Sequence, residues 1–183
     1  MSLKIAVNKL DHCRGRLLAP VAVVEYGDYQ CPFCASAYPE LEKVIEEFDS
    51  QLCFAYRHFP LRNIHPYAAL AAMSAEAAGQ QGQFWNMHRL LYENSAELSE
   101  RRILECAEAL ELDMDRFATD LDQDELKEKV SEDFSGGVRS GVNGTPTLFL
   151  NGERFDGPPL YPALRSALVE ILSETGPTSS TWR

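Results

Sequence analysis

The chain has 183 residues, of which 45% are hydrophobic and 25% are charged, as in an ordinary globular protein with a buried core. Acidic residues outnumber basic ones 28 to 17, which gives a formal net charge of -11. This excess argues against binding to nucleic acids or to anionic lipids, because both require Lys and Arg to neutralise phosphates. A chain of this length needs neither disulfides nor a metal for stability, so its five cysteines require a separate explanation.

The N-terminal residues 1–9 contain an apolar run that is too short for a secretory signal, and no segment has the length of a membrane-spanning helix. Either the protein stays in the cytoplasm, or an export signal was removed before residue 1. An odd number of cysteines favours a reducing compartment, because a leftover thiol in an exported protein invites wrong pairing. We therefore expect a cytoplasmic protein, or a periplasmic one if such a signal was removed.

The first half of the chain predicts a strand, a helix and a second strand. Residues 21–26 form a β-branched apolar run that is typical of a buried strand. Residues 31–48 place apolar side chains on one helical stripe, with Pro32 in the first turn, where proline is tolerated. Residues 51–57 predict the second strand, so the segment reads as a βαβ unit.

The rest of the chain predicts a helical block followed by a hairpin and a closing helix. The Gly136–Gly137 pair either interrupts or ends the last helix of the block. The Asn151–Gly152 pair is a hairpin signal. The expected segments are helices at 66–78, around 84–91, from Ser99, from Asp113 and from about 124, strands at 147–150 and 153–155, and a helix at 160–172.

This order predicts an α/β fold with an inserted helical subdomain. The connection between the second and third strands is far longer than one crossover helix requires, so we expect it to be a subdomain rather than a loop. The predicted boundaries are 1–62 with 141–183 for the sheet domain and 63–140 for the insertion. Within the sheet domain, residues 1–17 are expected to be an N-terminal extension and 176–183 a flexible tail.

The sharpest chemical feature is Cys31-Pro32-Phe33-Cys34. Two cysteines three residues apart at the start of a helix lie on one face, within reach of a disulfide bond. The first cysteine stands at the positive end of the helix dipole, among unpaired backbone N–H groups, so we expect its pKa to be lowered. The second lies one turn further in and should be more buried. Cys31 is therefore the expected nucleophile and Cys34 the expected resolving thiol.

Half of a structural zinc site is the main alternative for this pair. Zinc needs about four Cys or His ligands, usually as a second close pair, and no second Cys-x-x-Cys occurs here. We therefore expect no metal. Cys53 and Cys106 are interpreted as small buried hydrophobes, and Cys13 as a thiol that is free or relays a disulfide. His58, His65 and His88 could indicate a Cys–His hydrolase, but a lone His on an apolar helix face, like His88, more often serves packing and a local hydrogen bond.

Thr145-Pro146-Thr147 is the second feature. Taken alone it is an ordinary turn proline before a strand, since only about 5–6% of X-Pro bonds in folded proteins are cis. Together with Cys31–Cys34, however, it resembles the active site of the bacterial DsbA-like thiol–disulfide oxidoreductases of the thioredoxin superfamily. The matching segments follow the family order over about residues 18–172: Glu25–Cys34, Tyr56–Leu61, Phe84–His88, Gly141–Thr147 and Phe149–Gly152.

The resemblance implies a thioredoxin-like fold with a helical insertion, and a cis Pro146 packed against the disulfide. It also implies that the backbone of Thr145 hydrogen-bonds the substrate strand. In the family, the position of Glu25 holds a buried carboxylate that helps to move the proton of the second cysteine. Burial raises a carboxyl pKa, so such a group could exchange protons near neutrality. The alternative for Glu25 is an exposed acid at a sheet edge.

Pro32 and Phe33 are expected to tune the redox strength of the pair. Strongly oxidising members of the family carry a histidine next to the second cysteine, where it stabilises the thiolate, and Phe33 cannot supply that charge. We therefore expect a reduction potential between about -120 mV and about -270 mV, the values of the extreme oxidant and of thioredoxin.

The sequence thus predicts an enzyme that exchanges disulfides with protein substrates and an unidentified redox partner. It should need no bound cofactor and act as a monomer. Two alternatives stay open: a glutathione-linked reductase of glutaredoxin type, and a metal-binding or interaction module with structural cysteines.

Overall fold

Five strands form one mixed sheet, in the order β1-β3-β2-β4-β5, in the computed structural model, which describes residues 1–174. The parallel pair β2–β3 lies at the centre, and β1, β4 and β5 join by antiparallel pairing. This is the predicted α/β arrangement of a βαβ unit and a hairpin. The strands are β1 (His12–Gly15), β2 (Val21–Gly27), β3 (Leu52–His58), β4 (Thr147–Leu150) and β5 (Glu153–Phe155).

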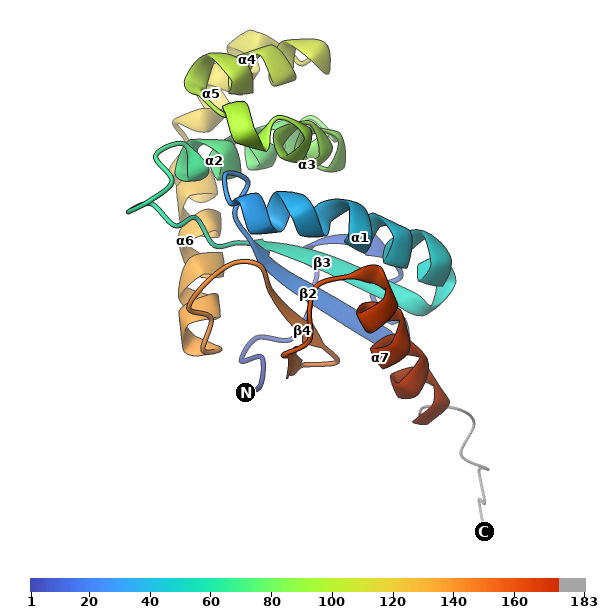
Figure 1. Cartoon of the computed structure of the whole chain (residues 1–183). Helices are drawn as coiled ribbons and strands as arrows, with labels where there is room; N and C mark the ends of the chain where they lie inside the picture. The colour runs from blue at the N-terminus through green and yellow to red at the C-terminus, as the bar shows by residue number, and fades with distance from the viewer. Residues whose placement is uncertain (175–183) are drawn as a thin grey trace.

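Seven α-helices accompany this sheet within the described residues. Figure 1 shows α1 and α7 along the sheet and α2 to α5 gathered beyond one end of α1, with α6 extending from that group down beside the end of the sheet. The helices are α1 (Pro32–Phe48), α2 (Ala68–Gly79), α3 (Phe84–Glu93), α4 (Glu100–Ala109), α5 (Met114–Leu121), α6 (Asp124–Arg139) and α7 (Tyr161–Glu174).

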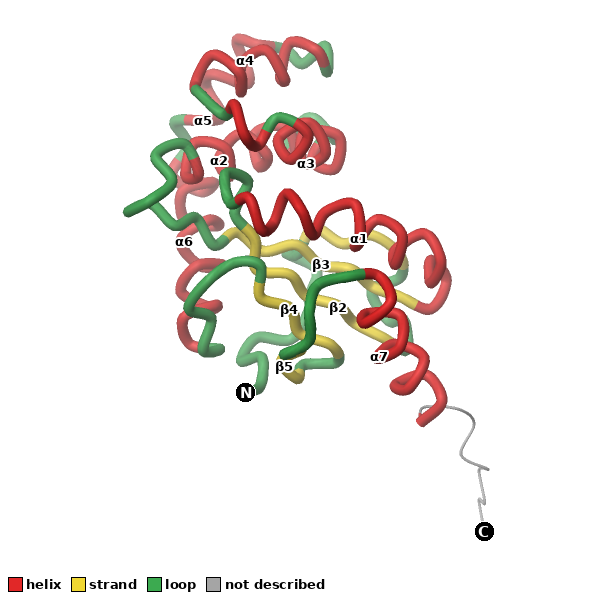
Figure 2. The backbone as a smooth tube through the Cα atoms, in the orientation of Figure 1, coloured by secondary structure: helices red, strands yellow, loops and turns green. Residues whose placement is uncertain are grey.

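The sheet buries a different cluster on each face. On one face, β-strand residues such as Val23 and Phe54 pack with Leu41 of α1 and Leu168 of α7, in a core that continues into the inserted helices. Residues of the opposite face, including Tyr26, form a smaller cluster to which the N-terminal segment adds partly buried side chains. The colouring by secondary structure in Figure 2 shows that this N-terminal segment is mostly loop. Cys31 and Cys34 belong to the core of the first face.

The sequence did not predict β1, which lies inside the expected N-terminal extension. This strand has only four residues and no apolar alternation, so it carries no recognisable strand pattern. A tertiary contact stabilises the segment before it. The buried guanidinium of Arg57 donates to both carboxylate oxygens of Asp11, at 2.7 and 2.9 Å, and to the carbonyls of Ile5 and Ala6. Within the predicted N-terminal extension, residues 5–15 are thus held against the sheet by buried contacts.

Two helix ends also differ from the sequence pattern. The first inserted helix starts at Ala68 instead of Pro66, because the preceding turn is tied to the loop before α1: the Tyr67 N–H donates to the side chain of Gln30 at 2.8 Å. The last helix of the block, α6, continues through both glycines. A Cβ atom at Gly137 would lie 2.7 Å from the ring of Phe59, so this glycine permits close packing and does not end the helix.

Two further expectations concern the ends of the chain and the membrane. The predicted flexible tail, residues 176–183, lies outside the described residues. Over residues 1–174, none of the helices combines the length and the apolar character needed to cross a bilayer.

Candidate active site

Cys31 and Cys34 stand at the start of α1, where the chain leaves β2. Cys31 is the N-cap residue with extended backbone angles, and Pro32 occupies the first turn. Proline has no backbone N–H group, and an N–H group in the first turn would have no partner within the helix. Pro32 therefore favours the start of the helix at this point. Cys34 is completely buried and Cys31 is 2% exposed, whereas Phe33 between them is 72% exposed. The two cysteines are free thiols and hydrogen-bond to each other.

The surroundings of Cys31 stabilise its anion. The hydrogen bond from the Cys34 thiol contributes most, and the Thr145 hydroxyl and the backbone N–H groups of Phe33 and Cys34 add to it. Together they outweigh the effect of burial and lower the pKa of Cys31 to about 5. Cys34 has the opposite environment, since its burial raises its pKa well above the usual value. At neutral pH the arrangement therefore holds Cys31 as a thiolate and Cys34 as a thiol.

The loop before β4 closes over this pair. The Thr145–Pro146 peptide bond is cis. When Cys31 is protonated, its thiol donates to the carbonyl oxygen of Thr145 at 3.4 Å. With Cys31 protonated, the buried Thr145 hydroxyl has no hydrogen-bond partner among the described residues. The structure thus brings together two segments that lie 114 residues apart in the sequence.

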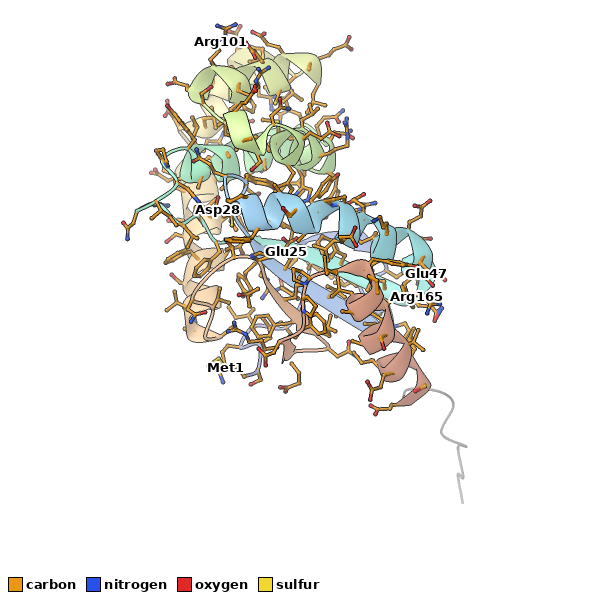
Figure 3. All side chains as sticks on the ribbon, viewed as in Figure 1. Met1, Glu25, Asp28, Glu47, Arg101 and Arg165 are labelled. Atoms are coloured by element: carbon orange, nitrogen blue, oxygen red, sulfur yellow. The ribbon has the colours of Figure 1, made fainter. Side chains whose placement is uncertain are left out.

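Glu25 is a buried acid on the same side of the sheet. It is 2% exposed, and its Oε1 atom has no hydrogen-bond partner among the described residues. Burial, followed by the negative charges of Cys31 and Glu42, raises its pKa to about 8. The alternative of an exposed edge acid is therefore wrong, because β2 is a central strand. Figure 3 labels Glu25 beneath the first turns of α1. A carboxyl group with this pKa can both accept and release a proton near neutral pH.

Sequence reasoning missed the role of Asp28, which organises the loop before Cys31. Its side chain is fully buried and accepts hydrogen bonds from the backbone N–H groups of Gln30 and Leu61, both at 2.8 Å, and from the His65 ring at 2.7 Å. Its carbonyl accepts from the Cys31 N–H at 3.1 Å. The sequence places this position between the strand at 21–26 and the helix at 31–48, but its partners come from distant segments.

The three histidines form no catalytic pair with a cysteine in the described residues. His58 is hydrogen-bonded to Glu76, His65 to Asp28, and His88 to the hydroxyl of Tyr29 at 3.0 Å. His88 is buried among aromatic rings, and this burial lowers its pKa well below the usual value, so it stays neutral. The packing interpretation of His88 is confirmed. Within residues 1–174 no cluster of three or more His, Cys, Asp or Glu side chains could hold a metal ion.

A family model described as Thioredoxin matches residues 8–170, which includes the whole sheet and both cysteines at the start of α1. The chain belongs to the thioredoxin family. Its assignment to the thioredoxin superfamily, and its fold with an inserted helical region, are thereby confirmed.

Solved structures share this thioredoxin fold over nearly the whole chain. A thioredoxin-like oxidoreductase from Silicibacter pomeroyi is 25% identical, with a TM-score of 0.79 over 91% of this chain and 94% of that one. The thiol-disulfide exchange protein alpha-DsbA2 from Wolbachia pipientis is 21% identical, with a TM-score of 0.80 over 90% of this chain and 88% of that one. BdbD from Bacillus subtilis is also 21% identical, with a TM-score of 0.79 over 90% of this chain and 94% of that one. The helical insertion is therefore a shared feature of these folds.

More similar sequences occur as parts of larger proteins. The Na(+)/H(+) antiporter NhaA 1 of Salinispora arenicola is 44% identical over 165 residues, which is 90% of this chain and 25% of that protein. The protein of the same name from Mycolicibacterium vanbaalenii is 39% identical over 150 residues, 81% of this chain and 24% of that protein. The thioredoxin-family chain thus spans about a quarter of the length of the curated relatives that it matches.

Proposed function

We propose that this chain is a protein thiol–disulfide oxidoreductase that works through Cys31 and Cys34. The observation that carries the proposal is the pairing of one thiol whose pKa is lowered to about 5 with a completely buried second thiol at the same helix start. Attack on a substrate disulfide requires the Cys31 thiolate, and resolution of the resulting mixed disulfide requires the Cys34 thiol.

The proposed cycle uses only groups in the site. The Cys31 thiolate attacks a substrate disulfide, which forms a mixed disulfide and releases one substrate thiolate. Cys34 then loses its proton and attacks Cys31, which releases the second substrate thiolate and leaves the Cys31–Cys34 disulfide. Glu25 accepts the Cys34 proton, which its raised pKa permits near neutrality. In the reverse direction, a substrate thiolate attacks the Cys31–Cys34 disulfide, and the same steps oxidise the substrate.

The surface around the site supports a polypeptide substrate. Phe33 is 72% exposed and Ile64, in the loop that Asp28 holds, is 69% exposed. The backbone of Thr145 lies beside the Cys31 sulfur, so we propose that it hydrogen-bonds an extended substrate strand while Pro146 keeps the loop close to the dithiol. Protein thiols and disulfides are the proposed partners, and the redox poise of the compartment sets the direction of exchange.

An insulin reduction assay with dithiothreitol tests this proposal. We expect the wild type to accelerate insulin precipitation, Cys31→Ser to abolish the acceleration, and Cys106→Ser, a matched cysteine substitution in α4, to leave it unchanged. A parallel assay with glutathione and a small mixed disulfide addresses the glutaredoxin alternative. Insulin reduction that survives Cys31→Ser would contradict the proposed mechanism, and rapid turnover with glutathione alone would favour the alternative.

A further inference from the structure

A second pair of cysteines lies on the adjacent strands β1 and β3, outside the candidate active site. In the antiparallel register Cys13 faces Ala55 and Gly15 faces Cys53, so the two cysteines are diagonal neighbours. The Arg16 N–H donates to the Leu52 carbonyl at 3.1 Å, which makes that pair hydrogen-bonded. Since the two kinds of pair alternate, both cysteines occupy non-hydrogen-bonded pairs, in which facing side chains approach more closely.

The two thiols interact directly across the strands. A hydrogen bond between them raises the pKa of Cys13 and lowers the pKa of Cys53. Such a contact shares one proton between the sulfurs, so either of them can carry the thiolate when the other keeps the proton.

The position of the pair separates it from Cys31 and Cys34. Cys13 packs against the cluster of Val24, Ala55 and Phe149 on one face of the sheet. The cysteines of α1 belong to the core of the other face. Cys53 is completely buried, but Cys13 is partly exposed on the edge strand β1. A small thiol reagent can therefore reach Cys13 without entering the candidate active site.

We propose that Cys13 and Cys53 are a second redox-active dithiol, which small disulfides such as oxidised glutathione convert to an intramolecular disulfide. In the singly ionised pair the shared proton moves to the Cys53 sulfur, and the Cys13 thiolate attacks the glutathione disulfide, which forms a mixed disulfide and releases one glutathione thiolate. Cys53 gives its proton to that thiolate and then attacks the Cys13 sulfur, which releases the second glutathione thiolate. Two protein thiols are oxidised, one disulfide is reduced to two glutathione molecules, and the two thiol protons end on glutathione.

The strand geometry makes this second disulfide easy to reduce. Diagonal neighbours stand about 7–8 Å apart between their Cα atoms, slightly beyond the usual range of about 4.4–6.8 Å for a disulfide. Bond formation therefore requires β1 to move towards Cys53, and an edge strand that is paired on one side only can do so. A bond that holds β1 away from its relaxed position is more oxidising than an unstrained structural disulfide. The pair thus behaves as a reversible sensor and not as a permanent staple.

Thiol counting in a variant without the active-site cysteines tests the proposal independently of the proposed enzymatic function. Cys31→Ser combined with Cys34→Ser leaves three of the five cysteines. After treatment with oxidised glutathione, we expect one free thiol, Cys106, and a peptide that links Cys13 to Cys53, which glutathione in excess releases. Adding Cys13→Ser to the same variant should abolish the linked peptide.

Peptide mapping of the oxidised wild type should show the same link beside the Cys31–Cys34 disulfide, which guards against misfolding of the variant. Three free thiols after oxidation, stable glutathione adducts without a linked peptide, or a link to Cys106 would each overturn the proposal. The insulin assay on the wild type reports on the Cys31–Cys34 pair, so failure of either proposal is recognised separately.

Discussion

The electrostatic environment of Cys31 is the residue-scale feature on which the proposed chemistry depends. Helix position alone predicts a lowered pKa, and the structure adds the Cys34 thiol as the largest contribution. Cys34 thus both lowers the pKa of Cys31 and serves as its disulfide partner. Substitution of Cys34 therefore separates its contribution to the Cys31 pKa from that of the helix N-terminus.

We predict that the alkylation rate of Cys31 by iodoacetamide stays high down to about pH 5 and falls below it, since only the thiolate reacts. Cys34→Ala removes the donor and should raise this midpoint, whereas Cys34→Ser, which keeps a hydroxyl donor, should raise it less. Rates measured by mass spectrometry between pH 3 and 9 check this prediction. Midpoints of both variants equal to that of the wild type would mean that Cys34 does not contribute to the lowered pKa.

Glu25 should make the stability of the folded protein fall as the pH rises. Its pKa is raised to about 8 in the folded protein, against 4.5 as the ordinary value, so the folded state binds the proton more tightly. The stability that this proton contributes is complete below about pH 4.5 and is lost as the pH rises to 8. The loss is at most about 1.4 kcal/mol per pH unit.

We predict that Glu25→Gln, which has the same shape and no titration, flattens the loss of stability between these pH values in urea unfolding of the reduced protein. The same variant should slow the resolution of a mixed disulfide at Cys31 by about 10²-fold or more, as is typical when a general base is removed. Unchanged resolution together with a flattened stability profile would assign Glu25 a structural effect only.

The residue at position 33 should influence the reduction potential of the Cys31–Cys34 pair. Its exposed ring supplies no positive charge next to Cys34, so we expect a reduction potential between about -120 and -270 mV. Phe33→His should move the potential towards the more oxidising end, because a histidine there would stabilise the thiolate of the reduced form. Titration of the dithiol in glutathione buffers measures both values. A wild-type potential outside this window would contradict the prediction, and Phe33→Leu serves as the uncharged control.

At the scale of elements, a buried carboxylate links the inserted helices to the sheet. Glu76 of α2 is hydrogen-bonded to His12 of β1 at 2.9 Å and to His58 of β3 at 2.8 Å. These two bonds outweigh the effect of burial and lower the pKa of Glu76 well below its usual range. The carboxylate thus stabilises the folded protein above its ordinary pKa of 4.5, and this contribution is lost as the pH falls below that value.

We predict that Glu76→Gln destabilises the protein by about 3 kcal/mol at pH 7, the cost of breaking a buried charged hydrogen-bond network. The difference from the wild type should shrink as the pH falls below about 4.5, because protonation of the wild-type carboxyl removes the same interaction. Urea unfolding at both pH values checks this. Glu97→Gln, which changes an exposed acid, is the matched control and should change stability by less than about 0.5 kcal/mol.

At the scale of the whole molecule, buried contacts fix the inserted helical region to β3 and to the loop before α1. The Tyr92 hydroxyl of α3 donates to that of Tyr56 in β3 at 3.0 Å, and the Ser95 hydroxyl donates to the Tyr29 carbonyl at 2.7 Å. Both contacts are buried. The division into a sheet domain (1–62 with 141–183) and an insertion (63–140) stays a prediction. These buried contacts indicate that the two parts fold as one unit.

We predict that native-state hydrogen exchange gives the same opening free energy for amides of α3 and of β3. Elements that share buried contacts on both sides of a boundary should open together. The loop at residues 61–64, which is largely exposed, should open at lower free energy and serves as the internal reference. Opening of α2 to α5 well below that of the sheet would show that residues 63–140 form an independent unit.

The sequence by itself determined the features that are local or periodic. The central strands follow from β-branched runs, and α1 follows from helical spacing. The hairpin follows from the Asn151–Gly152 turn, in which Asn151 adopts a positive φ of 46°. The Cys31–Cys34 dithiol is local as well, because a spacing of three residues at a helix start fixes both the contact and the dipole.

Only the tertiary structure decided which distant groups meet. Thr145 reaches Cys31 across 114 positions, and the burial of Glu25 depends on β3 and β4 pairing on both sides of β2. The short strand β1 forms because β3 supplies its partner, and the contact between Cys13 and Cys53 follows from that pairing. Neither a composition nor a local pattern encodes such contacts, since the free energy that maintains them comes from burial and pairing between segments far apart in the chain.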